Sequence, residues 1–143
     1  MKLAFEDASN FEGDISAWDV SNVENFGQTF RAMDSFNQDL SDWNVSSATN
    51  MHQMFEYADS FNQDISNWDV SSVTDMGNMF KDASSFNQDL SGWDVSNVLN
   101  MIQVFGSTTD LSDENKCSIE STWSSNSAWP YDWSEYCNQA PIS

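Results

Sequence analysis

The chain has 143 residues, with 23 acidic against 4 basic side chains and a formal net charge of -19 at pH 7. This length corresponds to a single domain, and so negative a field repels phosphate backbones and anionic membrane surfaces. We therefore expect no binding to nucleic acid and no direct membrane insertion. The charge favours cationic partners or divalent metal ions, or serves solubility alone.

A 25-residue repeat organises the chain from its first residues to residue 105. Tryptophan recurs at positions 18, 43, 68 and 93, and phenylalanine recurs at the same interval from position 5 to position 105. Self-similarity at such a period is typical of a solenoid, in which each unit buries its apolar face against its neighbours. We expect a repeat array over 1–105, opened by a partial unit at 1–10, and a Trp-rich C-terminal cap over 106–143.

The unit at 61–85 shows the expected local structure. Ile65, Trp68, Val70 and Val73 follow the spacing of leucine-rich repeats, with tryptophan at the second leucine site. Trp68 and Val70 would point inward from a short strand, and Ser71 would cap a helix whose apolar residues recur at helical spacing over 73–80. The sequence thus predicts an α/β repeat solenoid, leucine-rich-repeat-like, with one short parallel strand and one short helix per unit.

The outward positions of the expected strands form two columns, which we predict as the face for a ligand or partner. Neighbouring strands lie about 4.8 Å apart, so the carboxylates of one column would stack at close range. Ca²⁺ bridging Asp19, Asp69 and Asp94 is one interpretation, and otherwise no cofactor is expected. The other interpretation is that each aspartate accepts hydrogen bonds from the following serine or backbone amide. The columns are Asp19, Asn44, Asp69 and Asp94, and Ser21, Ser46, Ser71 and Ser96.

A second aspartate column precedes the expected strands. It comprises Asp14, Asp39, Asp64 and Asp89, with Asn37, Asn62 and Asn87 nearby. Asparagine and aspartate at such positions cap turns, and we expect an asparagine ladder from unit to unit. Calcium loops of the EF-hand or nonapeptide type need a different, glycine-bearing spacing.

No catalytic arrangement can be assembled around the single histidine, His52. Neither a Ser-His-Asp set, a glycine-rich phosphate loop nor a two-histidine metal motif is present, so we expect no enzyme and no catalytic residues. Asn44-Val45-Ser46 is the one N-glycosylation sequon. A glycan there would argue against this face being a docking surface.

Two cysteines, Cys117 and Cys137, flank the Trp-rich tail. We expect a disulfide between them and hence an oxidising compartment, with two free thiols in a cytosolic protein as the alternative. Trp123, Trp129 and Trp133 would cover the open edge of the last repeat, although an aromatic platform for sugars is a second interpretation. The opposite edge, around Phe5 and Phe11, should be covered by more repeats, a partner subunit or a self-contact.

The cassette M-F-x-x-A-x-x-F-N-Q-D-(L/I)-S-x-W-D-V-S-x-V-x-x-M resembles the BspA-like leucine-rich repeats of surface proteins catalogued as DUF285. It is carried here by Met54-Phe55, Ala58, 61–66, 68–71, Val73 and Met76, and recurs around Trp43 and Trp93. The resemblance implies a secreted or cell-surface adhesion or interaction module and brings no catalytic residues with it.

These observations predict a non-catalytic extracellular or lumenal protein-interaction or adhesion module that presents an acidic face to a protein partner. Two alternatives stay open. The chain could be a structural or linker subunit of a larger multiprotein assembly, or it could bind Ca²⁺, polysaccharide or ice through its regular columns. Binding that is sensitive to salt would favour the acidic face, whereas salt-insensitive binding would favour an exposed apolar edge.

Overall fold

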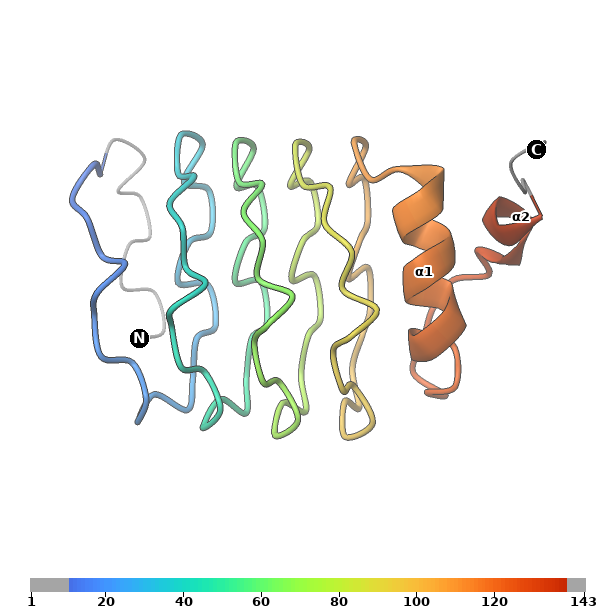
Figure 1. The fold of residues 1–143 in the computed structure, drawn as a ribbon, viewed down its shortest axis with the longest axis horizontal. Coiled ribbons are helices and arrows are strands. Elements are labelled where there is room, and N and C mark those ends of the chain that lie inside the picture. The colour runs from blue at the N-terminus through green and yellow to red at the C-terminus, as the bar shows by residue number, and fades with distance from the viewer. Residues whose placement is uncertain (1–10, 139–143) are drawn as a thin grey trace.

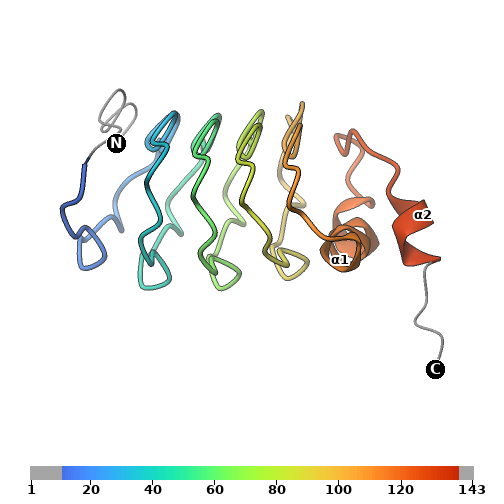
Figure 2. The same cartoon turned by 90° about the horizontal axis from the view of Figure 1, so that it is seen from above.

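The computed structural model describes residues 11–138. Figure 1 shows the chain running in windings that lie side by side through its blue, green and yellow parts, followed by two helices. These helices are α1, Asp113–Trp123, and α2, Ser134–Cys137. Figure 2 shows the same order of windings from above, with α1 next to the last of them.

The predicted α/β repeat solenoid, with one strand and one helix per unit, is wrong. Between residues 11 and 112 no helix forms, and strand-like pairing is reduced to isolated parallel bridges that link Asn25, Asn50, Asp75 and Asn100. These bridges lie in the segment for which a helix was expected. The expected strand at Trp68 and Val70 is instead an irregular segment between turns at 66–67 and 71–72, so the described chain has no sheet and is mostly coil and turn.

The backbone explains why no helix forms where the apolar spacing suits one. In the unit with residues 76–82, the N–H groups of residues 76, 78, 80 and 82 donate to carbonyls 24 residues further along the chain, not to carbonyls within the unit. Asn78 and Asp82 have φ values of 56° and 57°, and residues in this left-handed region do not continue an α-helix. The preceding units repeat both features, with positive φ at Gln28, Ala32, Gln53 and Tyr57.

Four N–H groups in each of the first three units therefore point toward the C-terminal end of the stack of windings. The same bonds start from residues 26, 28, 30 and 32 and from residues 51, 53, 55 and 57. In the opposite sense, Thr74 N–H donates to the Thr49 carbonyl and Leu99 N–H to the Thr74 carbonyl. The backbone hydrogen bonds that point toward the C-terminal end recur every 25 residues and run in one direction along the stack. We call them the directional ladder.

The core contains aromatic columns that run through the windings. Phe55 stacks on Phe80 with ring centroids 5.6 Å apart, and Phe80 stacks on Phe105 at 5.5 Å. Phe61 and Phe86 form a second column at 6.0 Å. Offset stacking at these distances adds to the burial of apolar area. Phe11 packs half-buried against this core, whereas Phe5 lies outside the described residues.

A tryptophan column ties each winding to its neighbour through buried hydrogen bonds. The indole N–H of Trp43, Trp68 and Trp93 each donates at 3.0 Å to the carbonyl 28 residues earlier. Trp123, at the end of α1, continues the column by donating to the Leu90 carbonyl at 3.0 Å and stacking on Trp93 at 6.0 Å. The helical cap therefore occupies the place that the next winding would take.

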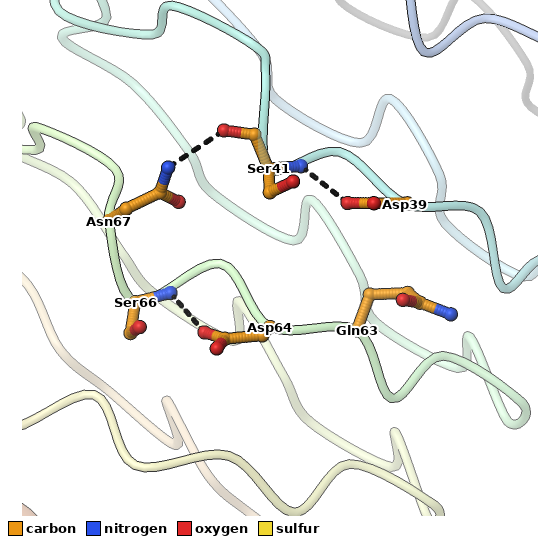
Figure 3. Close-up of a pocket in the computed structure, with 6 residues that line it drawn as sticks. All are labelled: Asp39, Ser41, Gln63, Asp64, Ser66 and Asn67. Carbon is orange, nitrogen blue, oxygen red and sulfur yellow. Dashed lines mark hydrogen bonds between the residues drawn. The ribbon is translucent and has the colours of Figure 1, made fainter.

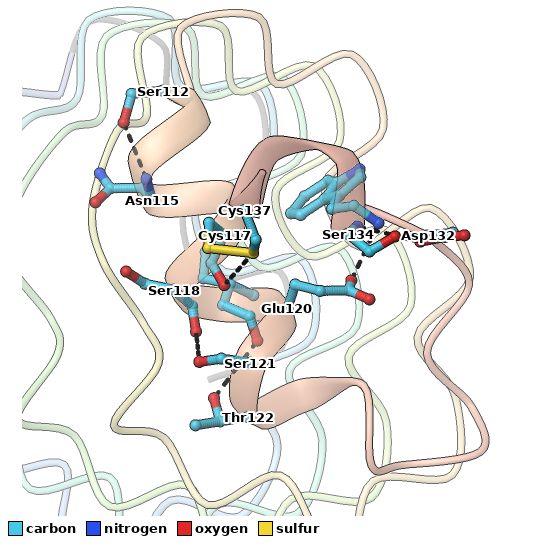
Figure 4. Close-up of a disulfide and its surroundings, with 12 residues drawn as sticks. Ser112, Asn115, Cys117, Ser118, Glu120, Ser121, Thr122, Asp132, Ser134 and Cys137 are labelled. Atoms are coloured by element: carbon cyan, nitrogen blue, oxygen red, sulfur yellow. Dashed lines mark hydrogen bonds between the residues drawn. A yellow bond between two sulfur atoms is a disulfide. The ribbon is translucent and has the colours of Figure 1, made fainter. Parts of the chain in front are cut away.

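The predicted disulfide is confirmed, since Cys117 in α1 is bonded to Cys137 at the end of α2. Figure 4 shows this bond beside Glu120, whose carboxylate faces the segment that returns from α1 to α2. Glu120 Oε2 accepts hydrogen bonds from the Trp129 indole at 2.7 Å and from the Trp133 backbone N–H at 3.2 Å. The two helices and their connection are thus held together covalently and by a polar contact.

Candidate functional site

The most regular polar feature is a row of exposed turns, one in each unit, formed by the eight predicted face residues. In each turn the Oδ1 atom of the first residue accepts the backbone N–H of the serine two residues later at 3.0 Å and its hydroxyl at 2.6 Å. We call this row the Asp/Asn column. It consists of the pairs Asp19–Ser21, Asn44–Ser46, Asp69–Ser71 and Asp94–Ser96.

The local sequence explains why these polar side chains face outward. In the third unit Trp68 and Val70 are buried at 4% and 1% exposure, so Asp69 between them points to solvent. The serine bonds then close an Asx-type turn, in which the side chain mimics a backbone acceptor. The interpretation that each aspartate accepts hydrogen bonds from the following serine is confirmed by these contacts.

The turns keep the carboxylates ionised. The Ser71 hydroxyl, followed by its backbone N–H, lowers the pKa of Asp69 below its ordinary value, while the Asp94 charge acts weakly in the opposite direction. The pKa values of Asp19 and Asp94 are lowered by the same hydrogen bonds from Ser21 and Ser96. Hydrogen bonds to the charged form therefore outweigh the repulsion between neighbouring units.

The column does not assemble a calcium site from the predicted ligands Asp19, Asp69 and Asp94. Asn44 stands between Asp19 and Asp69, so only Asp69 and Asp94 come from adjacent windings. Across residues 11–138, no three His, Cys, Asp or Glu side chains lie close enough together to hold a metal ion. Calcium needs six to eight oxygen ligands. The geometry therefore supports charge presentation rather than ion coordination.

The second aspartate column makes the same kind of turn, as its capping role predicted. Asp39 and Asp64 each accept the backbone N–H of the serine two residues later at 2.9 Å. Figure 3 shows these two turns on neighbouring windings, with Asn67 Nδ2 donating to the Ser41 carbonyl at 2.8 Å. A shallow polar pocket of about 310 Å³ lies between the two windings. It is lined by Asp39, Ser41, Gln63, Asp64, Ser66 and Asn67.

The sequence did not predict this pocket, because it depends on how closely two windings approach.

The predicted asparagine ladder is confirmed. Asn37 Oδ1 accepts the Asn62 N–H and Asn62 Oδ1 accepts the Asn87 N–H, both at 2.9 Å. The ladder ends on the cap, where Asn87 Oδ1 accepts the Ser112 N–H at 2.9 Å. Its regularity indicates a structural role for the asparagines.

The imidazole of His52 lies beside a carboxylate that the sequence did not indicate, without a hydrogen bond at Nδ1. Its Nδ1 lies 3.4 Å from Asp75 Oδ1 in the following unit. The only available signal was that histidine stands where the neighbouring units have Gly27 and Gly77. No nucleophile or second histidine accompanies this pair among the described residues.

The aromatic residues of the cap pack mainly on one another. Trp129 meets Trp133 edge to face at 5.2 Å, and Tyr131 stacks on Trp133 at 4.9 Å. The Lys116 ammonium lies 5.7 Å from the Trp133 ring centre and 4.6 Å from that of Tyr136. These ring faces are therefore already in contact with protein groups, which suits a cap better than a sugar platform.

Comparison with known proteins identifies one family. The family model described as Mycoplasma protein of unknown function, DUF285, matches residues 1–127. The chain matches no curated protein and no solved structure. In the part of the chain that the structure describes, neither helix has the length and apolar character that crossing a membrane requires.

Proposed function

Because this chain belongs to the family described as Mycoplasma protein of unknown function, DUF285, we propose its function from the acidic column itself. The protein is a non-catalytic interaction or adhesion module that binds a cationic protein surface through Asp19, Asp69 and Asp94. The observation that carries this proposal is the row of exposed carboxylates, each held in one orientation by a serine. Fixed charges lose less side-chain entropy on binding than mobile ones do.

The setting we propose is extracellular or lumenal, as for a BspA-like surface protein. The Cys117–Cys137 disulfide is consistent with an oxidising compartment. The net charge of -19 supports long-range attraction of a basic partner, which raises association rates and makes them depend on salt.

The alternative is a structural subunit in a larger assembly, and one observation favours it. Leu99 and Ile102, on the last winding, are 80% and 62% exposed. The positions that correspond to Leu99 in the other units are Glu24, Thr49 and Thr74, and those that correspond to Ile102 are Gly27, His52 and Gly77. An apolar contact through these two residues would be insensitive to salt, which separates it from binding through the column.

The test uses a lysine-rich peptide as the cationic probe and protein made in a host that does not glycosylate. The triple variant Asp19→Asn, Asp69→Asn, Asp94→Asn keeps the turns, because Asn44 already makes the same two bonds to Ser46. We expect affinity to fall about tenfold and the salt dependence to weaken.

The matched control removes three exposed charges elsewhere, through Asp34→Asn, Asp42→Asn and Asp110→Asn. This control should lose about threefold or less in affinity. Equal losses in the two triple variants would mean that the overall charge attracts the peptide and that the column is not a binding site. Unchanged affinity in both would direct attention to Leu99 and Ile102.

A further inference from the structure

Asn44 is the one uncharged member of the Asp/Asn column. The equivalent position in the other three units is aspartate, and all four positions are followed by valine and serine. The second unit therefore reads Asn44-Val45-Ser46, which is the acceptor sequence for N-linked glycosylation and occurs once in the chain.

The turn holds the side chain of Asn44 in a single arrangement. Its Oδ1 accepts the Ser46 backbone N–H at 3.0 Å and the Ser46 hydroxyl at 2.6 Å. A backbone N–H must face an acceptor, so these contacts also fix which amide atom is oxygen. The other atom, Nδ2, makes no hydrogen bond with any residue between 11 and 138.

The amide is also accessible. Asn44 is exposed, whereas Val45 is buried at 1% and anchors the turn to the core beside Trp43. Asn44 Nδ2 thus lies at the surface, while the residues before and after it, Trp43 and Val45, are buried. The disulfide at Cys117 is consistent with a compartment in which such acceptors meet their donors.

We propose that Asn44 is an N-glycan attachment site. The donor is an oligosaccharide linked to a polyprenyl pyrophosphate. Asn44 Nδ2 forms a bond to the anomeric carbon of the first sugar, the bond from that carbon to the pyrophosphate oxygen breaks, and the lipid pyrophosphate leaves. The amide nitrogen loses one proton to a base, and Oδ1 keeps its bonds to Ser46.

The attachment site divides the proposed binding face. A glycan on Asn44 stands between Asp19 and Asp69, so a bulky partner would reach Asp69 and Asp94 but not all three carboxylates together. This consequence rests on the proposed function, whereas the modification itself does not. The glycan would then determine which windings a partner can contact.

The experiment is secretion of the full chain from eukaryotic cells, followed by intact mass measurement with and without peptide-N-glycosidase. We expect one glycan on the wild type, with aspartate left at position 44 after enzymatic removal. Ser46→Ala should abolish the modification. Asp69→Asn, which gives the third unit the same Asn-Val-Ser sequence in the same turn, should add a second glycan.

Secreted wild-type protein with an intact disulfide and no glycan at Asn44 would overturn the proposal, whatever Asp69→Asn does. The disulfide, checked by mass under non-reducing conditions, separates this result from misfolding. Binding of the lysine-rich peptide is measured on unglycosylated protein. Failure of the proposed function and failure of the attachment site are therefore distinguishable.

Discussion

Replacing Trp68 with phenylalanine isolates the contribution of the tryptophan column to stability. Trp68 is 4% exposed, donates its indole N–H to the Leu40 carbonyl at 3.0 Å, and stacks on Trp93 at 6.2 Å. The Leu40 carbonyl keeps a second bond from the Trp43 backbone N–H, so the lost hydrogen bond costs about 0.5–1.5 kcal/mol. The smaller ring leaves a cavity that adds about 1–2 kcal/mol.

Trp68→Phe should therefore lower the free energy of unfolding by about 1.5–3.5 kcal/mol, which corresponds to a fall in Tm of about 5–12 °C for a domain of this size. Urea unfolding and scanning calorimetry measure the two quantities. Tyr57→Phe is the matched control, since Tyr57 is 36% exposed, and it should change stability by about 0.5 kcal/mol or less. A similarly small effect of Trp68→Phe would refute the view that the indole column holds adjacent windings together.

Three further predictions concern the turns, the cap and the contacts between windings. The Ser71 hydroxyl lowers the pKa of Asp69 in the folded state. The stability that this hydrogen bond adds is therefore present above the pKa of an unfolded aspartate, about 3.9, and is lost as the pH falls through the pKa of Asp69 in the folded state. The stability difference between wild type and Ser71→Ala should therefore be present near pH 6 and shrink in urea titrations as the pH falls below about 3.9. Cys117→Ser opens a crosslink between residues 20 apart and should cost about 3 kcal/mol, with dithiothreitol destabilising the wild type but not the variant. Gly77→Ala places a methyl group 2.6 Å from Asn100 Nδ2 and 2.8 Å from His52 Nδ1. Both side chains must shift, and Asn100 gives up its hydrogen bond to Asp75 Oδ1, so the variant should cost about 1 kcal/mol in thermal unfolding. Gly92→Ala, which meets nothing within 4 Å, should be nearly neutral, and equal effects of the two glycine variants would contradict the packing argument.

The sequence predicted the contacts that depend only on the repeat period. Residues 25 apart share an environment, so the buried phenylalanines, the asparagine ladder and the capped aspartate turns are all predictable from the sequence. The Cys117–Cys137 bond followed from the position of the two cysteines around the tail. The predictions that rest on the period need the order of the units but not the backbone conformation within them.

The backbone within a unit could not be predicted in the same way. Apolar residues over 73–80 fit a helical period, but the decisive feature is positive φ at Asn78 and Asp82. Left-handed conformations are usually inferred from glycine, and the equivalent positions here include Ala32 and Tyr57, which give no such signal. The pocket between Asp39 and Asp64 was missed because it depends on the approach of two windings.

The role of Trp123 was only partly predictable. It follows Trp93 by 30 residues, not by 25, so the period places it outside the column. The sequence suggested that it covers the last unit. Its indole bond to the Leu90 carbonyl, equivalent to that of each earlier tryptophan, emerged only from the way α1 lies against the last winding.

The directional ladder gives the stack of windings an electrical polarity. In each of the first three units four backbone N–H groups point toward the cap and few point back, so the peptide dipoles add along the stack as they do along a helix. Ordinary sheets nearly cancel such dipoles, because neighbouring groups alternate in direction. The end that carries the cap is therefore positive in partial charge, and Asp113 and Glu114 in the first turn of α1 lie near this end. A highly acidic protein can thus place carboxylates at its C-terminal end at less electrostatic cost than its net charge suggests.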